Sequence, residues 1–502
     1  MSLGQTGGFR ARSQSGDKPP AAKQPNRGSS GQKPKQAAGN RRPRPNEGDH
    51  VQGIVAMGVD KARAVAFEVL LSVATKDAYA NLVLPKTLRT HKLSGRDAAF
   101  ATELTYGSLR TLGVLDAVIN AVSSRPEDKV QSGVLAALRL GAYQVLYTRV
   151  EPHAAVDTTV RIVEGIGQEK AKGFANAVMR SITRKTPEQW FTELTPSGDL
   201  AAMAFRHAHP EWIARSFAKS LPADELEAAL AEDSARPRVH LVARPGEITG
   251  EELALISGGE EGTYSPYAVY LEGGDPGAVE PVKEGLAAVQ DEGSQIIARA
   301  VTVAPVEGAD QGRWLDLCAG PGGKAALIGA LARIDGARVD AVEIAPHRAR
   351  LIENTVRDLP VKVHVADGRR PGLEGGYDRV LVDAPCSGLG ALRRRPEARW
   401  RKKESDIAEL SQLQFELLSS AVDLVRPGGV IVYSTCSPDI RETRNVVDRA
   451  IEELGVQELD AQQLTCGMES VGEEKSVQMW PHRHGTDAMF FAVLRRPTTD
   501  ND

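Results

Sequence analysis

The chain has 502 residues, 41% of them hydrophobic and 25% charged, and a formal net charge of −4. That length exceeds one ordinary core and predicts two to four domains. No apolar run reaches the roughly 18 residues of a membrane span, and the N-terminus has no apolar signal segment, so we expect a cytoplasmic protein with no membrane partner. Four cysteines make no disulfide framework and fit a reducing compartment, where thiols stay free for catalysis.

The basic N-terminal segment, residues 1–55, holds ten lysines and arginines against three acidic residues, a charge of +7, which leaves −11 for the rest. It is rich in Gly, Pro, Ser and Gln and lacks hydrophobic periodicity, so we expect it to be disordered. A basic tail on an acidic body suggests a polyanionic partner, because Lys and Arg release counterions from phosphates. A solvated tail with no specific role is the open alternative.

The next region is predicted to be helical. Apolar residues recur at spacing four between residues 60 and 184, as at Val65 and Val69, which predicts an all-helical bundle. Residues 186–236 continue with a helical stretch and connect to residues 237–300, a small α+β unit. The strands expected in that unit are Val239–Val242 and Ala268–Leu271, and its helices are expected near Gly250–Ile256 and Ser294–Ala300.

From Arg313 onward, strands and helices alternate, which predicts a doubly wound, mostly parallel α/β sheet. Ligands of such sheets bind at the carboxyl ends of the strands. Pro427-Gly428-Gly429 is expected to be a turn before a strand. The expected strands are Trp314–Leu317, Val339–Ile344, Val361–Val365, Arg379–Val382, Val430–Ser434 and Met489–Leu494, and the expected helices are Lys324–Leu331, Pro346–Asp358 and Ser405–Val425.

A glycine-rich turn follows the first of these strands, with the sequence Asp316-Leu317-Cys318-Ala319-Gly320-Pro321-Gly322-Gly323-Lys324. Glycines there let backbone amides approach a ligand at a helix N-terminus. Glu343, at the end of the second strand, can accept both hydroxyls of a ribose. An isolated glycine cluster is usually only a structural turn, but the strand before, the helix after and the later acid favour a nucleotide-type cofactor. Neither a P-loop nor a Gly-x-Gly-x-x-Gly fingerprint fits the spacing.

Cys386 and Cys436 each stand at the carboxyl end of an expected strand, in a Pro- or Ser/Thr-rich turn. Small thiols often simply pack at such places. Two thiols beside a cofactor turn predict covalent chemistry on carbon 5 of a pyrimidine, which becomes nucleophilic only after a thiolate adds at carbon 6. The residues alone leave open which thiol adds. Cysteine separations of 68 and 50, without a Cys-x-x-Cys pair, predict no metal site.

Two aspartates close further strands. Asp367 could contact an adenine amino group, although Asp-Gly is also a common turn, and Asp383 could face the cofactor or the target base. Basic residues follow the Cys386 loop, and we expect them to contact an RNA backbone and to stack a base, with a solvated charge run as the alternative. These basic stretches are Arg393-Arg394-Arg395 and Arg399-Trp400-Arg401-Lys402-Lys403.

Taken together, these residues resemble the RNA 5-methylcytosine methyltransferases of the Nol1/Nop2/Sun group. The helical region is similar to the NusB-like RNA-binding domain of that family, most clearly over Leu138–Ala155. The other segments that carry the likeness are Val289–Gln295, Asp316–Lys324, Asp383–Ser387, Arg393–Trp400, Thr435–Ser437 and Asp487–Leu494.

The sequence patterns and the resemblance together predict a multidomain chain with four parts. These are a disordered basic tail (1–55), an all-α NusB-like RNA-binding domain (56–190), a linker with a small α+β domain (191–300) and an α/β Rossmann-like class I methyltransferase domain (301–502). The implied methyl donor is S-adenosylmethionine. The implied substrate is a cytosine in RNA, most simply 16S ribosomal RNA, free or in a precursor particle, and a monomer is expected.

The resemblance also implies roles for single residues. Cys318–Lys324 would hold the methionine part of the donor, Glu343 its ribose, Asp367 its adenine region, and Asp383 the donor near its target. Cys436 would be the nucleophile, and Cys386 would help release the product while the carbon-5 proton is removed. Three positions depart from the family pattern: Arg395 stands where relatives often have His, Arg441–Asn445 replaces the usual Glu-Glu-Asn, and Glu343 replaces a common Asp.

Two other classes of function remain open. One is an RNA- or protein-binding module with an inactive sheet. The other is an enzyme that acts on DNA cytosine or on an amino group. An amino-group enzyme would place Asn/Asp-Pro-Pro-aromatic after the fourth strand, where this chain has Asp383–Cys386. A DNA enzyme would use the thiol after the fourth strand and would not need Thr435-Cys436.

Overall fold

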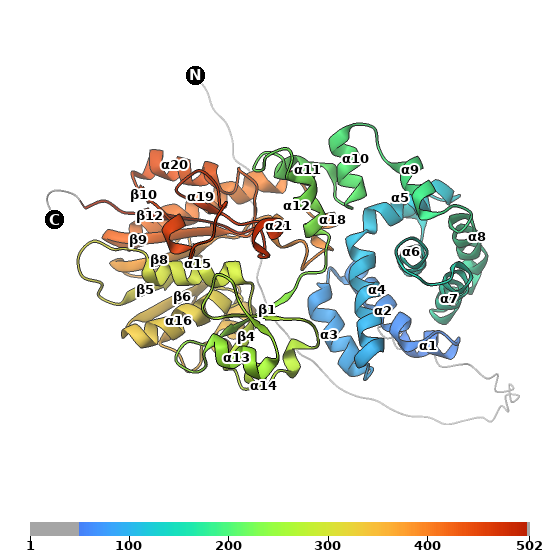
Figure 1. The fold of residues 1–502 in the computed structure, drawn as a ribbon, viewed down its shortest axis with the longest axis horizontal. Helices are drawn as coiled ribbons and strands as arrows, with labels where there is room; N and C mark the ends of the chain where they lie inside the picture. The colour runs from blue at the N-terminus through green and yellow to red at the C-terminus, as the bar shows by residue number, and fades with distance from the viewer. Residues whose placement is uncertain (1–49, 499–502) are drawn as a thin grey trace, which may run out of the picture. The chain divides into compact units, whose positions relative to one another are not determined.

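The computed structural model describes residues 50–498 (Figure 1). Most of the basic tail expected at 1–55 lies outside the described residues. Residues 51–55 belong to helix α1 (Val51–Ala56), and Val51 and Ile54 are buried in the helical core, so the expectation of disorder is wrong for this short stretch. Among the described helices, none is long and apolar enough to cross a membrane.

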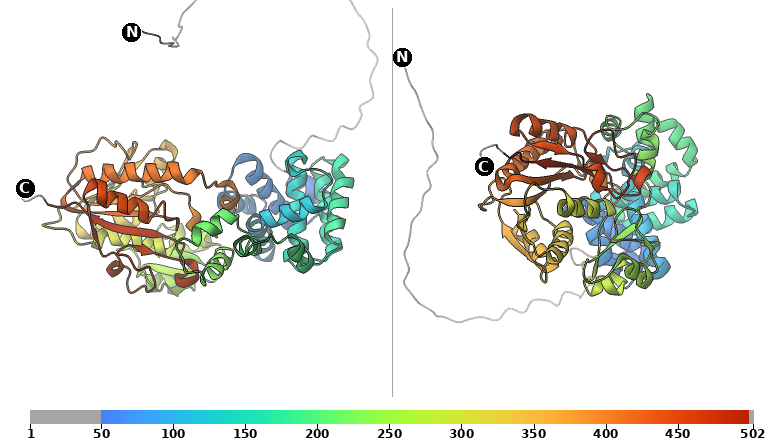
Figure 2. Two further views of the ribbon diagram at one scale, coloured as in Figure 1. Left: turned by 90° about the horizontal axis from the view of Figure 1, so that it is seen from above. Right: turned by 60° about the vertical axis from the view of Figure 1, so that its left-hand side comes forward.

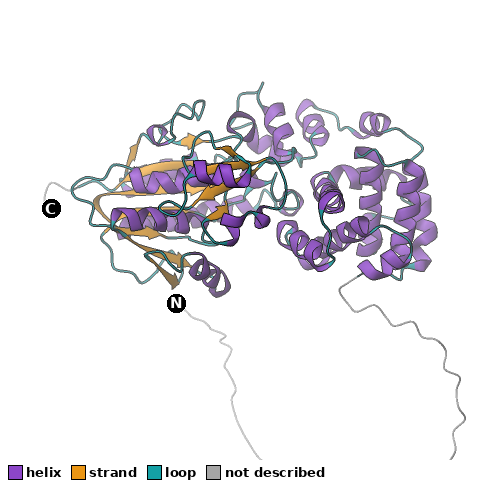
Figure 3. Cartoon of the chain, turned by 60° about the horizontal axis from the view of Figure 1, so that its bottom comes forward, coloured by secondary structure: helices purple, strands orange, loops and turns teal. Residues whose placement is uncertain are grey.

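The N-terminal part is a helical bundle, as predicted from its periodicity (Figure 3). Asp60 caps α2 by accepting a hydrogen bond from the backbone N–H of Arg63 (3.0 Å). Gly107 lets α4 approach α6 closely, since a Cβ at this position would lie 2.0 Å from the ring of Tyr143. The remaining helices of the bundle are α2 (Lys61–Lys76), α3 (Ala80–Thr90), α4 (Gly95–Arg110), α5 (Leu112–Val122), α6 (Ser132–Tyr147), α7 (Pro152–Gly165), α8 (Lys172–Ile182) and α9 (Pro187–Leu194).

A linker and a small antiparallel sheet follow. The strand order of this sheet is β2-β3-β1-β4, and the two strands expected from sequence are confirmed as β1 and β3. The border expected at residue 300 falls inside helix α15 (Glu292–Val303), which packs against α16 and the larger sheet. The elements of the linker and the small sheet are α10 (Asp199–Arg206), α11 (Glu211–Phe217), α12 (Leu226–Asp233), β1 (Val239–Ala243), α13 (Gly250–Ser257), β2 (Glu260–Glu261), β3 (Ala268–Leu271), α14 (Glu280–Lys283) and β4 (Ala287–Val289).

The C-terminal part is built on the expected mostly parallel sheet. Its order is β10-β12-β9-β8-β5-β6-β7, with β11 paired to β12; strands β5 to β9 are parallel, and β10 to β12 are antiparallel. Its strands are β5 (Arg313–Asp316), β6 (Arg338–Glu343), β7 (Val361–Val365), β8 (Tyr377–Asp383), β9 (Val425–Thr435), β10 (Gln457–Leu459), β11 (Val477–Gln478) and β12 (Phe490–Arg495). Its other helices are α16 (Gly323–Asp335), α17 (Pro346–Thr355), α18 (Ala398–Arg401), α19 (Asp406–Leu424), α20 (Arg444–Leu454) and α21 (Pro481–His484).

Helices cover both faces of this sheet (Figure 2). Apolar residues of α15 and α16 form one core with side chains such as Trp314 and Phe491. Apolar residues of α19 and α20 form a second core on the other face, with Tyr377 and Tyr433. Burial on both faces is what makes the parallel strands read as continuous apolar runs in the sequence.

The turn expected at Pro427-Gly428-Gly429 is wrong, because this segment lies within β9. Val425 pairs with Tyr377 and Val430 pairs with Arg379, so the four residues 426–429 bulge opposite the single residue Asp378. The side chain of Arg426 holds the bulge by donating to Asp378 Oδ1 (2.6 Å). Gly428 supplies the positive φ of 74° that the bulge requires.

Arg393 and Arg394, which begin the basic stretch after the Cys386 loop, make internal contacts. The RNA contact expected for these two arginines is therefore wrong. Arg393 Nε donates to Asp487 Oδ1 (2.7 Å), and Arg394 Nη2 donates to Asp291 Oδ1 (2.8 Å). Both aspartates and Arg393 are buried. A buried charge must be paired, and this requirement takes up both guanidinium groups.

Helix α18 links the helical bundle to the large sheet. Arg399 is fully buried and donates to Asp233 Oδ2 (2.8 Å). Trp400 Nε1 donates to the carbonyl of Leu109 (2.8 Å), and Arg401 donates to three carbonyls at and just after the end of α2. Trp400 is therefore packed between domains and is not free to stack a base. Arg395 and Lys403 stay exposed, and RNA contact at these two residues remains a prediction.

Candidate active site

The two thiols after β8 and β9 lie side by side. Asp383, at the end of β8, pairs in parallel register with Ser434 of β9. Cys386 and Cys436 follow within three residues of those positions, and their Sγ atoms are 3.4 Å apart. Both thiols are partly buried. Two neighbouring strands thus bring together sulfurs that are 50 residues apart in sequence.

A buried carboxyl group, that of Glu442, ties the two thiol loops together. It accepts hydrogen bonds from the backbone N–H of Ser387 (2.7 Å) and from the hydroxyls of Ser387 and Ser437, the residues that follow the two cysteines. Gln414 of α19 donates to it as well (3.1 Å). Glu442 is fully buried. Because one side chain bonds to both loops, it fixes the distance between them.

The two thiols differ electrostatically. Lys324 Nζ donates to Asp383 Oδ2 (2.9 Å); burial opposes its charge, but Asp383 outweighs burial and raises the pKa of Lys324. The hydrogen bond from Cys386 holds the pKa of Cys436 below its ordinary value against burial and Asp383, and the charges of Lys324 and Arg395 act in the same direction. The same hydrogen bond, together with burial, raises the pKa of Cys386. Cys436 is therefore the thiol closer to thiolate.

The turn Cys318–Lys324 joins β5 to α16 and is held close to the end of β6. Arg348 Nη2 donates to the carbonyl of Gly320 (2.6 Å) and lies 3.4 Å from Glu343 Oε2. A Cβ at residue 320 would lie 2.0 Å from Glu343 Oε2, so a side chain there would displace the carboxylate of Glu343. Gly322, with φ of 114°, is the N-cap of α16. The turn thus presents backbone and a buried carboxylate to the same space, as a nucleoside-binding site requires.

A second buried acid lies at the base of the turn. Asp316 Oδ1 accepts from the N–H of Cys318 (3.3 Å), whereas Oδ2 has no hydrogen-bond partner among the described residues. Burial and repulsion from Asp383 raise the pKa of Asp316 to about 7. Burial and the same acids also raise the pKa of Cys318, so this third thiol is poorly suited to attack. An unpaired carboxyl oxygen amid several acids fits a cationic ligand such as a sulfonium-bearing donor.

Asp367 lies at the edge of this site and is partly exposed. It pairs with Arg369 (2.7 Å), whose hydrogen bonds lower the pKa of Asp367. Arg369 also pairs with Glu416 of α19 (3.1 Å). A contact of Asp367 with an adenine amino group would therefore compete with the Arg369 pair.

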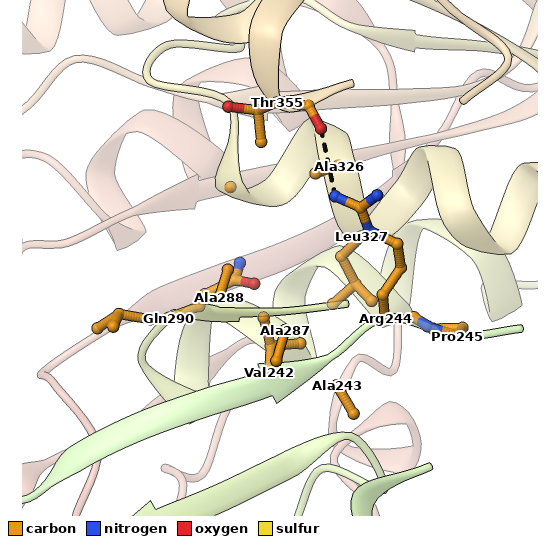
Figure 4. A pocket seen from close by; sticks show the side chains of 12 residues that line it. Val242, Ala243, Arg244, Pro245, Ala287, Ala288, Gln290, Ala326, Leu327 and Thr355 are labelled. Carbon is orange, nitrogen blue, oxygen red and sulfur yellow. Dashed lines mark hydrogen bonds between the residues drawn. The ribbon is translucent and has the colours of Figure 1, made fainter. Parts of the chain in front are cut away.

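A small apolar pocket is lined in part by Gly323 of the glycine turn, and Figure 4 shows its other lining residues. It has a volume of about 50 Å³ and lies between β1, β4 and α16. Arg244 crosses it and donates to the carbonyl of Thr355 (3.4 Å). The pocket has room for a few water molecules at most, so it is not the nucleoside site.

Sequence reasoning missed Glu442 and Arg348. Glu442 lies in the segment Arg441–Asn445, which departs from the family pattern, and its partner Ser387 lies 55 residues away, so no local signal joins the two residues. Arg348 lies in an ordinary amphipathic helix and reaches Gly320 only in the folded chain.

The chain is similar to two protein families and to several known proteins. The family model for 16S rRNA methyltransferase RsmB/F matches residues 300–495, and that of the NusB family matches residues 60–184. A Mycobacterium tuberculosis protein named as a methyltransferase is 55% identical over 447 residues, which cover 88% of this chain and 97% of that protein. Ribosomal RNA small subunit methyltransferase B of Cronobacter sakazakii is 35% identical over 386 residues, or 75% of this chain and 86% of that protein.

The fold also has a solved counterpart. The crystal structure of PH0851 aligns with a TM-score of 0.75 and 22% identity, over 86% of this chain and 98% of the other. At that identity the likeness concerns the fold.

Substitution Glu442→Ala should lower the free energy of unfolding by roughly 3 kcal/mol, because buried donors in both thiol loops lose their acceptor. Urea unfolding measures this change. The control is Glu404→Ala, which removes a partly exposed ion-pair partner of Arg441 and should cost under about 1 kcal/mol. Equal losses in the two variants would contradict the role given to Glu442.

The free energy of unfolding of the Asp316→Asn variant should rise relative to that of the wild type as pH increases. The folded protein keeps a proton on Asp316 up to about pH 7, whereas the unfolded chain releases it near pH 4. Between those values the folded state binds more protons, so this group makes the wild type less stable as pH increases. Urea unfolding of protein without bound ligand should show that, from pH 5 to pH 8, the free energy of unfolding of the Asn variant increases by about 2 to 4 kcal/mol relative to that of the wild type. Parallel pH curves would contradict the raised pKa.

Proposed function

Because the chain belongs to the RsmB/F family of 16S rRNA methyltransferases and is thus an S-adenosylmethionine-dependent RNA methyltransferase, we propose that it methylates carbon 5 of a cytosine. The substrate is RNA of the small ribosomal subunit, free or in a precursor particle. The enzyme acts as a monomer in the cytoplasm, where that RNA is assembled. The reaction proceeds through a covalent cysteine adduct.

The observation that carries this proposal is the 3.4 Å separation of the Cys386 and Cys436 sulfurs. Carbons 5 and 6 of a pyrimidine are bonded neighbours, so chemistry at both requires two groups that reach the same small space. One thiol must attack carbon 6 and another group must act at carbon 5. A cysteine that only fills space in the core does not require a second thiol within 3.4 Å of its sulfur.

The donor site is assigned to the turn Cys318–Lys324 with Glu343, Asp367 and Asp383. The glycine backbone would hold the methionine part, Glu343 the ribose, Asp367 the adenine region, and Asp383 the end nearest the target. When bound, S-adenosylmethionine supplies a methyl group made electrophilic by the sulfonium charge. The acids Asp316, Glu343 and Asp383 favour that charge electrostatically.

Residues of the chain activate the cytosine, remove the proton from carbon 5 and release the product. The target cytosine leaves its stack and enters the site. The Cys436 thiolate, favoured by Lys324, adds to carbon 6, and carbon 5 gains the electron density to accept a methyl group. The proton on carbon 5 must then leave. Cys386 Sγ takes up that proton as its own proton passes to a general base, which keeps Cys386 neutral as its raised pKa requires. The electron pair of the broken bond to carbon 5 restores the double bond between carbons 5 and 6, and Cys436 leaves carbon 6 as a thiolate.

Cytosine in RNA is favoured over the two alternative substrates. An amino-group acceptor would need no thiol, yet this chain carries two in contact. A DNA enzyme would use the thiol after β8, which here is Cys386, the thiol with the raised pKa. An inactive binding module would not need a pKa difference between the two sulfurs.

The test uses two single substitutions. Cys436→Ala should abolish methyl transfer, because no nucleophile remains to activate carbon 5. Cys386→Ala should slow the first addition, because Cys436 loses the hydrogen bond that lowers its pKa, but should still allow it and should block release, so protein accumulates on RNA as a covalent complex. Incorporation of labelled methyl groups into small-subunit ribosomal RNA measures the first result. The amount of covalent protein–RNA complex on a denaturing gel measures the second.

The opposite pattern would reverse the assignment. Activity retained in Cys436→Ala, together with loss of activity and no covalent complex in Cys386→Ala, would make Cys386 the nucleophile. No methyl incorporation into RNA by the wild type would support a binding module instead.

A further inference from the structure

Arg395 differs from the other arginines of its segment. Its side chain is exposed, and within residues 50–498 no hydrogen bond or ion pair of that side chain is found. The segment starts beside the thiols, since the N–H of Gly390 donates to the carbonyl of Cys436 (2.9 Å). The charge of Arg395 also reaches Cys436, where it helps to lower the pKa of the thiol. Among the described residues Arg395 is therefore a cation next to the site with no hydrogen-bond or ion-pair partner for its side chain.

The aromatic ring beside Arg395 comes from the helical domain. The Cζ atom of Arg395 lies 5.7 Å from the centroid of Tyr79, and that of Arg401 lies 6.0 Å from it. Tyr79 is nevertheless 45% exposed. A large aromatic side chain with a cation at its ring and almost half of its surface in water is an available stacking platform.

The loop that carries Tyr79 is held in place on both sides. Arg401 donates to the carbonyls of Asp77 (3.3 Å) and Ala78 (3.1 Å), and the N–H of Ala80 donates to Glu397 Oε1 (3.0 Å). Arg401 and Glu397 both belong to the segment that follows the Cys386 loop. The helical domain thus presents Tyr79 from a backbone fixed to the catalytic domain, and such preorganisation reduces the entropic cost of binding.

We propose that Tyr79 and Arg395 form a two-residue binding site for the RNA nucleotide that flanks the target cytosine. The flanking base stacks on the exposed ring of Tyr79, and its phosphate pairs with Arg395. This inference rests on the proposed function and extends it to the substrate path. Extrusion of the target leaves its neighbour without a stacking partner, and an aromatic ring accepts any base while a guanidinium accepts a phosphate.

The first test is the steady-state kinetics of methylation with unmodified small-subunit ribosomal RNA. Tyr79→Ala should raise KM for RNA about tenfold and change kcat less than twofold, since stacking of one base contributes to binding in this range. Tyr79→Phe keeps the ring and should behave as wild type. The matched control is Leu82→Ala, an exposed apolar residue of α3 near Tyr79, which should also behave as wild type. An unchanged KM in Tyr79→Ala overturns the proposal.

The second test measures equilibrium RNA binding without turnover, across salt concentrations. Arg395→Gln should reduce the slope of log affinity against log salt by about 0.7, the value for one single-strand phosphate contact, and Arg395→Lys should keep the slope. An unchanged slope in Arg395→Gln overturns the phosphate contact even if the Tyr79 variant fails to fold. A wild type that binds RNA with the expected Tyr79 and Arg395 effects but transfers no methyl group would refute the proposed function, and with it the flanking position, and would leave only an RNA contact at Tyr79 and Arg395.

Discussion

The parallel pairing of β8 with β9 is the constraint on which the site depends. The register that places Asp383 opposite Ser434 sends the next residues of both strands into adjacent loops, so Cys386 and Cys436 come within 3.4 Å. Strand pairing alone fixes only the start of each loop. Glu442 fixes the rest, because its one carboxyl group accepts hydrogen bonds from the residues that follow both cysteines. The sulfur separation is thus set by main-chain register and by a single buried side chain.

The hydrogen bond between the two thiols, with nearby charges, then distinguishes them: it lowers the pKa of Cys436 and raises that of Cys386. Lys324 comes from the glycine turn and bonds to Asp383 at the end of β8, and its charge also helps to lower the pKa of Cys436. The acids around Asp316 make the neighbouring space favourable to a cation. A bound sulfonium and a thiolate would therefore each find a stabilising environment within the same strand-end region.

The sequence predicted most elements, because apolar periodicity and glycine turns are local signals. Strands β1, β3 and β7 lie where expected, and the two thiols meet because strand ends of a parallel sheet share an edge. The buried ion pairs of Arg393 and Arg399 could not be predicted, since their acidic partners lie 94 and 166 residues away in the sequence. The bulge at Gly428 was missed because Pro-Gly-Gly reads as a turn unless Arg426 is known to meet Asp378. Glu442 was missed for the same reason: its role depends on tertiary proximity.

The most direct measurement uses RNA in which the target cytosine carries fluorine at carbon 5. Fluorine cannot leave as a proton does, so the adduct at carbon 6 should persist after methyl transfer. Mass spectrometry of the protease-digested complex should find the nucleotide bonded to the peptide that contains Cys436. A nucleotide bonded to the Cys386 peptide, or no covalent complex from an enzyme that methylates unmodified RNA, would contradict the account.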